Sequence, residues 1–254
     1  DNYGPSADFA TALYMRHENE AIAREVGTLR NAGNLDLVLD LGCATGRVAL
    51  MLAPAFNYTI GYDISPHMIA EARKKKTHGF NVKFKEADLE TGIPAESDSV
   101  SLVVMNLGTA SDIHDLRKIL AATKRVLKKD GRFVFSFYNS NALLYRWYAP
   151  WPASLKAEIN LDTHCLNVRL KDKLFTIHAR PYSVRDVKKM FAESGLSIGS
   201  VKTYPTITPI LPSEFFDEQD PKKEEEMVAS AEELESKLAD LEKGAYILVT
   251  GRKP

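Results

Sequence analysis

The sequence predicts an α/β fold: a doubly wound, Rossmann-like sheet of mostly parallel strands with helices on both faces. Apolar strand-like segments alternate along the chain with segments of helical periodicity, which is typical of βαβ units. The first strand, residues 37–41, reads Leu-Val-Leu-Asp-Leu and is apolar on both faces, as a central parallel strand is. The chain has 254 residues, 44% of them apolar, which is enough for one substantial core. We therefore expect a single domain over residues 1–254.

The elements follow in order. An N-terminal helical segment, residues 1–34, contains a helix within residues 11–30, because apolar residues recur there at mostly helical spacing and the Asn-Ala-Gly-Asn run at 31–34 ends it. After strand 37–41 the same criteria predict further helices and strands. The helices are residues 46–53, 66–76 and 113–127, and the strands are residues 58–63, 82–86, 100–105 and 132–138.

A first insertion interrupts this alternation after the fifth strand. Residues 139–180 are rich in aromatic side chains and then contain strand-like segments at 166–170 and 174–178, so we expect an inserted cap with a hairpin. The aromatic residues are Tyr145, Trp147, Tyr148 and Trp151. They either pack the insertion onto the sheet or line a pocket for an apolar or cationic substrate, because aromatic faces attract ammonium groups.

A second insertion follows a further helix and strand. Ser183 is the predicted N-cap of a helix that ends before Gly195, and residues 198–204 form a strand. The helical insertion, residues 205–243, begins with prolines and continues as a charged helix from about residue 221. Its apolar stripe at four-three spacing is Met227, Ala231, Leu234, Leu238 and Leu241. This stripe favours core packing, with self-association as a homodimer as the alternative; residues 245–250 form the last strand.

Charge and composition argue against several classes of protein. Lys and Arg number 33 against 34 Asp and Glu, a formal net charge of -1, so no global field attracts nucleic acid. Cys43 and Cys165 form neither a disulfide framework nor a metal-binding pattern, and we predict no metal site. No apolar run approaches the roughly 20 residues of a membrane span. We expect a soluble, cytoplasmic protein without a membrane partner, and the first residue, Asp1, leaves open a larger parent protein.

The strongest functional signal is the loop Asp-Leu-Gly-Cys-Ala-Thr-Gly at residues 40–46, between a buried strand and a helix. Gly42 and Gly46 permit a positive φ and close approach of a ligand to the backbone. Such loops bind S-adenosylmethionine (SAM) or a dinucleotide. A dinucleotide fingerprint needs glycines that admit a pyrophosphate at the helix N-terminus. Here Asp40 precedes the glycines, and an acid would repel a pyrophosphate but attract an amino group, which favours the methionine end of SAM.

Two further acids come at the ends of the next strands. Asp63, about 20 residues beyond the loop, can accept both hydroxyls of a ribose. Asp88, in the segment Ala87-Asp88-Leu89, can accept a hydrogen bond from the adenine amine. Each acid alone is more often a turn or cap residue. Ligands of open α/β sheets bind at the carboxyl ends of strands, however, and that is where these acids fall together.

These segments together resemble the class I SAM-dependent methyltransferases, over about residues 37–138 and more loosely over residues 182–250. The resemblance implies SAM as the cofactor and a seven-stranded sheet whose final strand, residues 245–250, is antiparallel. It also implies that Asp40 and Gly42 contact the methionine part, that Asp63 contacts the ribose, that Met68 and Asp88 contact the adenine, and that Asn106 lies nearest the sulfonium. The matching residues, which form the predicted cofactor site, are Asp40, Gly42, Cys43, Ala44, Gly46, Asp63, Ile64, Met68, Ala87, Asp88, Leu89 and Asn106.

One position departs from the family pattern. Ala44 stands where the family usually has glycine, and we expect its methyl group to reduce the room in the turn without abolishing binding. Cys43 is the common residue at its position, and we interpret it as a small buried filler rather than a nucleophile.

Methyl transfer from a sulfonium is an in-line displacement, so the protein mainly aligns the nucleophile and excludes water. A general base is needed only when the nucleophile carries a proton that must leave. The candidate catalytic residues are Tyr14 and His17 on the N-terminal helix and Tyr138 at the end of the fifth strand. His114 is a further candidate that also fits the first turn of its helix. For each of them the alternative is an ordinary structural or surface role.

The balanced charge and the insertion after the fifth strand favour a small-molecule acceptor. We hypothesise that the N-terminal helix and residues 139–180 form a lid over it. The first alternative is an RNA or protein methyltransferase that uses the lysines at 74–76 or 128–129. The others are a SAM-binding module that regulates a partner without catalysis, and a nicotinamide-dependent oxidoreductase.

Overall fold

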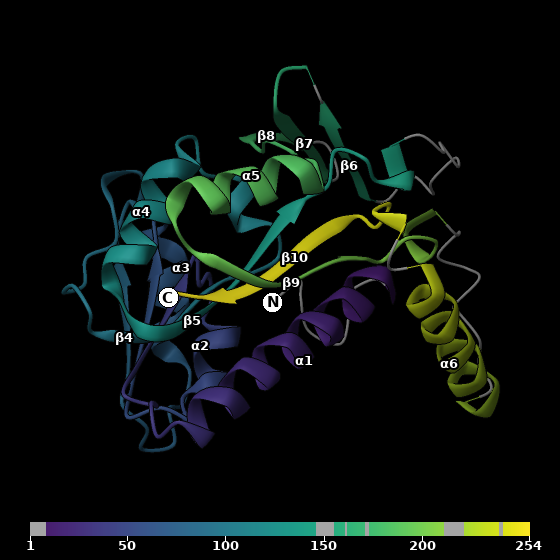
Figure 1. Ribbon diagram of the computed structural model, residues 1–254. Coiled ribbons are helices and arrows are strands. Elements are labelled where there is room, and N and C mark those ends of the chain that lie inside the picture. The colour runs from purple at the N-terminus through teal and green to yellow at the C-terminus, as the bar shows by residue number, and fades with distance from the viewer. Residues whose placement is uncertain (1–8, 146–154, 161, 171–172, 211–220, 239–240) are drawn as a thin grey trace.

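A seven-stranded sheet in the order β3-β2-β1-β4-β5-β10-β9 forms the centre of the protein (Figure 1). The computed structural model describes residues 9–145, 155–160, 162–170, 173–210, 221–238 and 241–254. The strands of this sheet are β1 (Leu37–Leu41), β2 (Tyr58–Asp63), β3 (Val82–Glu86), β4 (Val100–Met105), β5 (Leu127–Tyr138), β9 (Ser197–Tyr204) and β10 (Tyr246–Arg252). β10 is antiparallel to both of its neighbours, and β1 to β5 pair in parallel. The predicted mostly parallel sheet with an antiparallel final strand is confirmed.

Helices cover both faces of this sheet. They are α1 (Phe9–Asn31), α2 (Arg47–Leu52), α3 (Pro66–Lys74), α4 (Leu116–Val126) and α5 (Val184–Ser194). A further helix, α6 (Pro221–Leu238), projects away from the sheet (Figure 1). Alternate residues of the strands point to opposite faces: Val38, Leu102 and Val104 pack with the apolar side of α1 and α2. Leu39 and Val103, with their neighbours, pack with α4 and α5 on the other face. The doubly wound pattern therefore follows directly from strands that are apolar on both faces.

The strand order places a binding site before any side chain is considered. β1 pairs with β2 on one side and with β4 on the other, so the order reverses between β1 and β4. In open α/β sheets, ligands bind in the crevice at the carboxyl ends of the strands where the order reverses. The loop of residues 42–46, which follows β1, lies at this point.

The boundary between α4 and β5 differs from the prediction. Helix 113–127 was predicted, but α4 begins at Leu116 because Asp115 is its N-cap and accepts a hydrogen bond from the Lys118 N–H. Strand 132–138 was predicted, but β5 begins at Leu127, which pairs with Val100 before the register shifts. Asp130, with φ of 60°, sits within this irregular stretch. The charged segment of residues 128–130 concealed the strand because it interrupts the apolar pattern.

The first insertion is a separate antiparallel sheet in the order β6-β7-β8, above α5 in Figure 1. Its strands are β6 (Leu155–Asn160), β7 (Cys165–Leu170) and β8 (Lys173–His178). The predicted hairpin is β7 and β8, and the prediction missed β6. The insertion contacts the main sheet's loops where the His178 ring stacks on His114 with centroids 4.0 Å apart. Trp147, Tyr148 and Trp151 lie outside the described residues, and Tyr145 ends the short 3-10 helix η3 (Leu143–Tyr145).

The second insertion is attached through a buried acid rather than through its leucines. Glu235 of α6 is 0% exposed and accepts hydrogen bonds from the N–H groups of Thr206, Ile207 and Thr208 at 2.5, 2.8 and 2.8 Å. The predicted core packing of the apolar stripe is only partly correct, because Leu234 is 45% exposed and Leu241 is 56% exposed. Self-association through this stripe stays a prediction. Among the helices in the described part of the chain, none has the length and apolar character needed to cross a membrane.

We expect Glu235→Ala to lower the free energy of unfolding by about 3 kcal/mol, because it leaves buried N–H groups without their charged acceptor. Urea unfolding followed by circular dichroism measures this change. Glu233→Ala is the matched control: Glu233 is exposed on the same helix and pairs with Lys237, so its loss should leave the free energy of unfolding almost unchanged. Equal stability of the two variants would contradict this account of how α6 is held.

Candidate functional site

The loop after β1 is held in a tight conformation by its own backbone. Gly42 and Gly46 have φ of 73° and 84°, and the N–H groups of Gly42 and Cys43 both donate to the Tyr62 carbonyl. A Cβ at Gly42 would lie 2.4 Å from Thr109, and one at Gly46 would lie 2.5 Å from Phe84. Glycine is therefore required at both positions for conformation and for space. The loop presents its backbone to the crevice at the end of β1.

Ala44 has φ of 45°, in the left-handed region that favours glycine. Its N–H donates to Asp63 Oδ2 over 2.7 Å, which holds the residue in this conformation. Alanine is compatible with the turn, so the departure from the family pattern adds strain to the backbone and leaves the loop formed. Cys43 is buried, and burial raises the pKa of its thiol well above the ordinary value, which agrees with the interpretation of an inert filler.

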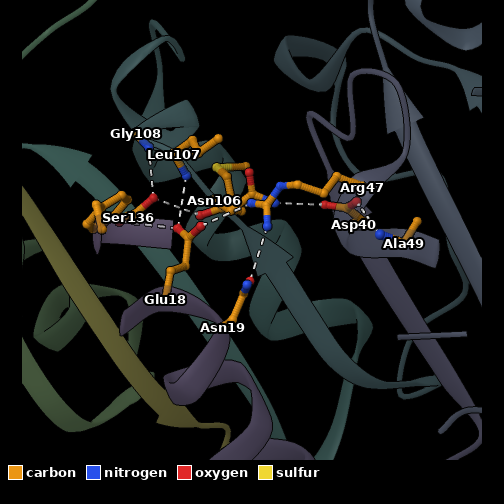
Figure 2. Close-up of polar contacts among 11 residues, drawn as sticks. Glu18, Asn19, Asp40, Arg47, Ala49, Asn106, Leu107, Gly108 and Ser136 are labelled. Carbon is orange, nitrogen blue, oxygen red and sulfur yellow. Dashed lines mark hydrogen bonds and ion pairs between the residues drawn. The ribbon is translucent and has the colours of Figure 1, made fainter. Parts of the chain in front are cut away.

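Asp40, at the end of β1, is a carboxylate with no exposed surface. Its Oδ2 accepts the Ala49 N–H at 2.9 Å, and its Oδ1 accepts from Asn106 Nδ2 at 3.4 Å (Figure 2). Burial raises the pKa of Asp40 to about 7, and the nearby acids Glu18 and Asp63 add to this effect. The structure thus brings Asp40 and Asn106 into contact, as the resemblance implied for two residues of one site. A cation placed here would favour the ionised form of Asp40.

Asp63, at the end of β2, connects the loop to the next part of the site. Its Oδ1 accepts the Ser65 N–H at 2.9 Å, and its backbone carbonyl accepts the Ala87 N–H at 2.9 Å. Beside it, Ile64 is 65% exposed and Met68 is 38% exposed, which is unusual for apolar side chains next to a buried sheet. Asp88 caps the short 3-10 helix η1 (Leu89–Thr91), accepting the Glu90 N–H, and Leu89 is buried. An apolar surface between two carboxylates suits a planar base attached to a sugar.

The segment after β4 forms the opposite wall of the crevice. Leu107 and Gly108 have φ of 49° and 80°, and a short 3-10 helix, η2 (Thr109–Ser111), follows them. A Cβ at Gly108 would lie 2.6 Å from the Tyr138 ring. The Tyr138 N–H donates to the Ser111 hydroxyl at 2.9 Å. These contacts join the end of β4 to the end of β5.

Glu18 of α1 extends into this crevice, and the sequence analysis missed it. Its side chain is 0% exposed, and its Oε1 accepts the Leu107 N–H at 2.9 Å and the Tyr14 hydroxyl at 3.2 Å. Arg47, the first residue of α2, places Nη2 3.6 Å from Glu18 Oε2 and donates from Nη1 to Asn19 at 3.1 Å. Figure 2 shows Glu18 and Asn19 of α1 on one side and Arg47 on the other, converging beside Asn106.

A signal for Glu18 was present in the sequence. Tyr14, Glu18 and Ile22 stand four residues apart, so Glu18 occupies the apolar stripe of its helix. A lone acid in such a stripe either disrupts the helix packing or is buried for a reason. Arg47 carried a weaker signal, since it follows Gly46 directly and any residue there faces the crevice or the neighbouring helix.

The predicted catalytic residues lie in different surroundings. Tyr14 is fully buried, stacks on Tyr246 with centroids 4.0 Å apart, and has its pKa raised by burial, which disfavours a phenolate. Tyr138 lies beside Tyr246, at 5.6 Å. His17 stacks on Tyr204 at 4.3 Å in a groove between α1 and β9, and burial lowers its pKa. The structure brings Tyr14 and Tyr138 together through Tyr246, while His17 faces a different side of α1 from Glu18.

His114 is exposed and its Nδ1 lies 3.1 Å from Glu90 Oε1. Its ring stacks on His178 of the insertion. This geometry connects the insertion to the segment after β4, and the role of His114 in catalysis stays a prediction.

The fold and the site together define a crevice that suits a nucleotide-type cofactor. A family model described as "Methyltransferase domain" matches residues 38–131. The chain is 30% identical over 169 residues to the Bacillus subtilis protein named "Uncharacterized methyltransferase YcgJ", covering 66% of this chain and 59% of that protein. It is 33% identical over 115 residues to the Bos taurus 18S rRNA (guanine-N(7))-methyltransferase, covering 41% of this chain and 40% of that protein. The chain thus spans less than two thirds of the length of these relatives.

A solved structure, the SAM-dependent methyltransferase from Clostridium acetobutylicum, superimposes with a TM-score of 0.61 at 18% identity, over 94% of this chain and 91% of that one. This similarity shows the shared fold. Residues 38–131 thus match a methyltransferase domain, and the comparisons support the class I SAM-dependent methyltransferase family. The predicted family, fold class and cofactor, SAM, are confirmed.

The raised pKa of Asp40 predicts how stability depends on pH. In an unfolded chain the pKa of Asp is about 4, so between about pH 4 and about pH 7 the folded state binds more protons than the unfolded state. The contribution of Asp40 to the free energy of unfolding therefore falls as the pH rises through this window. We expect Asp40→Asn, which cannot ionise, to have a higher Tm than the wild type above about pH 7.

Thermal unfolding from about pH 5 to about pH 8 measures this, and the Tm of Asp40→Asn should depend less steeply on pH. Asp36→Asn is the control, because Asp36 is exposed and Lys128 lowers its pKa, so that variant should not gain stability at high pH. A Tm profile of Asp40→Asn parallel to that of the wild type would refute the argument.

Proposed function

We propose that the chain transfers a methyl group from SAM to a small-molecule acceptor. The observation that carries this proposal is the convergence of Asp40, Asp63 and Asn106 around one glycine loop where the strand order reverses. Asp63 has one N–H donor on each carboxylate oxygen, and a carboxylate has about four acceptor sites. The Asp63 carboxylate can therefore still accept hydrogen bonds from the two ribose hydroxyls.

The residues present fit the cofactor in charge as well. Asp40 and Glu18 are buried acids, and Arg47 is the cation between them. They would hold the methionine end, with Arg47 available to its carboxylate and an acid available to its ammonium. Ile64 and Met68 would cover the adenine, and Asp88 would accept from its amine.

When bound, SAM supplies a methyl group on a positively charged sulfonium. The work of the protein is then alignment and exclusion of water. α1 brings Tyr14 and Glu18 over the ends of β4 and β5, and the insertion contacts the same region through His114 and His178. These elements would enclose an acceptor beside Asn106.

A small acceptor is favoured over RNA by the surface charges. Lys74 lies 2.6 Å from Glu71, and Lys128 pairs with Asp36, so these lysines are partly neutralised. Because one of the relatives is an rRNA methyltransferase, RNA is the second candidate for the methyl acceptor. Steep loss of RNA binding with rising salt would favour it. A SAM-binding module without catalysis is the third candidate, and it requires binding of SAM with no transfer.

We also infer a cytoplasmic location. Cys43 and Cys165 are both free cysteines, and reducing compartments keep cysteines in that state.

The first test is titration calorimetry with SAM and S-adenosylhomocysteine (SAH). We expect micromolar affinity, and Asp63→Ala should weaken it at least about tenfold, since the variant loses an acceptor for the ribose and the anchor of the Ala44 N–H. Asp98→Ala is the control, because the exposed Asp98 only pairs with Lys253. No binding of either ligand to the wild-type protein would overturn the proposed function.

The lid hypothesis has its own test. Replacing residues 155–178 by a short Gly-Ser linker should leave the affinity for SAH unchanged and reduce turnover of an acceptor at least about tenfold, because water enters and one wall of the site is lost. Radiolabelled methyl transfer measures the turnover. If turnover and acceptor KM match those of the full chain, the insertion is not a lid.

A further inference from the structure

Glu18 joins three elements of the crevice through one carboxylate. Oε1 is occupied by the Leu107 N–H and the Tyr14 hydroxyl, and the Ser136 hydroxyl also bonds to the carboxylate. Leu107 directly follows Asn106, the residue nearest the sulfonium in the proposed cofactor complex. Glu18 is therefore held where α1 meets the ends of β4 and β5 (Figure 2). In the proposed complex this position would lie between the cofactor and the acceptor.

The other carboxylate oxygen of Glu18, Oε2, lacks a hydrogen-bond donor within the described residues. Within the described residues, neither Glu18 Oε2 nor Arg47 Nη2 has a hydrogen bond, although both are buried and lie 3.6 Å apart. Buried polar atoms are nearly always hydrogen-bonded in folded proteins, so such atoms mark where a polar group of a ligand belongs. If Arg47 binds the carboxylate of the cofactor, Glu18 Oε2 becomes available to accept a hydrogen bond from a different group.

The acceptor side carries a second unsatisfied acid. Asp112 follows η2, and its Oδ1 is buried without a hydrogen bond among the described residues. Burial raises the pKa of Asp112 to about 7, and within the described residues no ion pair involves this acid. The neighbouring Ser111 bonds to the Tyr138 N–H and to the Arg180 N–H, which places Asp112 between the end of β5 and the insertion.

Aromatic residues contact Glu18 and the neighbour of Asp112, since the Tyr14 hydroxyl donates to Glu18 and the Tyr138 N–H donates to Ser111. Tyr14 stacks on Tyr246, and Tyr138 is tilted against Tyr246. Aromatic faces attract cations and do not compensate a negative charge. Glu18 has one cation beside it, Arg47, at 3.6 Å, which the cofactor's carboxylate would engage. With Arg47 engaged in this way, acids beside aromatic rings form a surface that favours a positively charged or protonated group over an anion.

We propose that the methyl acceptor is an amine and that Glu18 is the catalytic residue that takes up its proton. This inference rests on the proposed function and adds the class of substrate to it. The amine nitrogen attacks as the neutral base, and its lone pair forms the new bond to the methyl carbon. The carbon–sulfur bond breaks with its electron pair moving to sulfur, which becomes a neutral thioether. The nitrogen becomes a methylated ammonium, and one of its protons passes to Glu18 Oε2.

The charges distinguish an amine from other nucleophiles. As an amine reacts, positive charge moves from the sulfonium to the nitrogen, so a carboxylate on the acceptor side stabilises the transition state. A carboxylate or phenolate acceptor would instead enter a site that already has Glu18 and Asp112 as acids. Such an acceptor would be repelled before it reached the methyl group.

The decisive measurement is the ratio of two dissociation constants and needs no known acceptor. Sinefungin is the SAM analogue in which a carbon bearing an amino group replaces the methylsulfonium, so comparing it with SAH isolates the surroundings of an amine at the position of transfer. We expect the wild-type protein to bind sinefungin more tightly than SAH by calorimetry. Glu18→Gln should reduce this preference at least about tenfold, because Gln keeps a hydrogen-bond acceptor and loses the charge.

Glu25→Gln is the matched control. Glu25 lies on the same helix, about two turns further on, and faces Arg132 at 3.4 Å, away from the crevice. It should keep the wild-type ratio. Glu18→Asp keeps the negative charge but places it one methylene farther from the site, so we expect an intermediate ratio of the two dissociation constants. This variant replaces Glu18→Gln in the test if Glu18→Gln does not fold. An unchanged ratio in the Glu18 variants would overturn the proposal.

A second measurement uses the wild-type protein alone. Amines and acids of like shape, such as phenethylamine with 3-phenylpropionic acid and hexylamine with hexanoic acid, are compared by SAH release. We expect turnover of amines at least about tenfold faster than of acids. Faster methylation of the acids, with SAM bound normally, would overturn the inference and leave the proposed function intact. If the protein bound neither SAM nor SAH, both the proposed function and this inference would be refuted.

Discussion

The arrangement of the site depends on burying two carboxylates with a single guanidinium. Asp40 and Glu18 have no exposed surface, and the cation beside Glu18 is Arg47, whose Nη2 lies 3.6 Å from Glu18 Oε2. A buried charge costs several kcal/mol unless it is paired and hydrogen-bonded, so α1, the start of α2 and the end of β4 must stay together. This one constraint connects the N-terminal helix, which is remote in sequence, to the loop that follows β1.

Close packing of backbone segments supports that charge cluster. Gly42 lies against Thr109, and Gly108 lies against the Tyr138 ring, both with no room for a Cβ. The Thr109 side chain therefore packs directly on the backbone of Gly42, and the Tyr138 ring packs directly on the backbone of Gly108, which brings the loop after β1, the segment after β4 and the end of β5 together. The Leu107 N–H after β4 holds Glu18, and the Ala49 N–H of α2 holds Asp40, so the positions of both acids are fixed by the backbone.

Much of the fold and part of the site could be predicted from the sequence. The strands of residues 37–41 and 58–63 and the acids Asp40 and Asp63 were predictable, because parallel strands are apolar on both faces and acids at their ends stand out. β6 was missed although Leu155, Ala157 and Ile159 alternate, since a short edge segment after an aromatic-rich stretch gives a weak signal. Glu18 was missed because its importance arises from contacts with Leu107 and Arg47, which only the folded chain brings near.

The excess of negative charge in the crevice has a consequence for the whole reaction cycle. SAM carries one net positive charge, from its sulfonium and ammonium less its carboxylate, and it loses that charge when the methyl group leaves. With an amine acceptor the positive charge is not lost but appears on the product nitrogen. In the proposed complex Asp40 would lie beside the cofactor and Glu18 and Asp112 toward the acceptor, so acids would face the charge before and after transfer. Once a proton of the methylated ammonium has passed to Glu18, the product is a neutral amine and Glu18 is a neutral acid, so their attraction falls and release of the product is favoured.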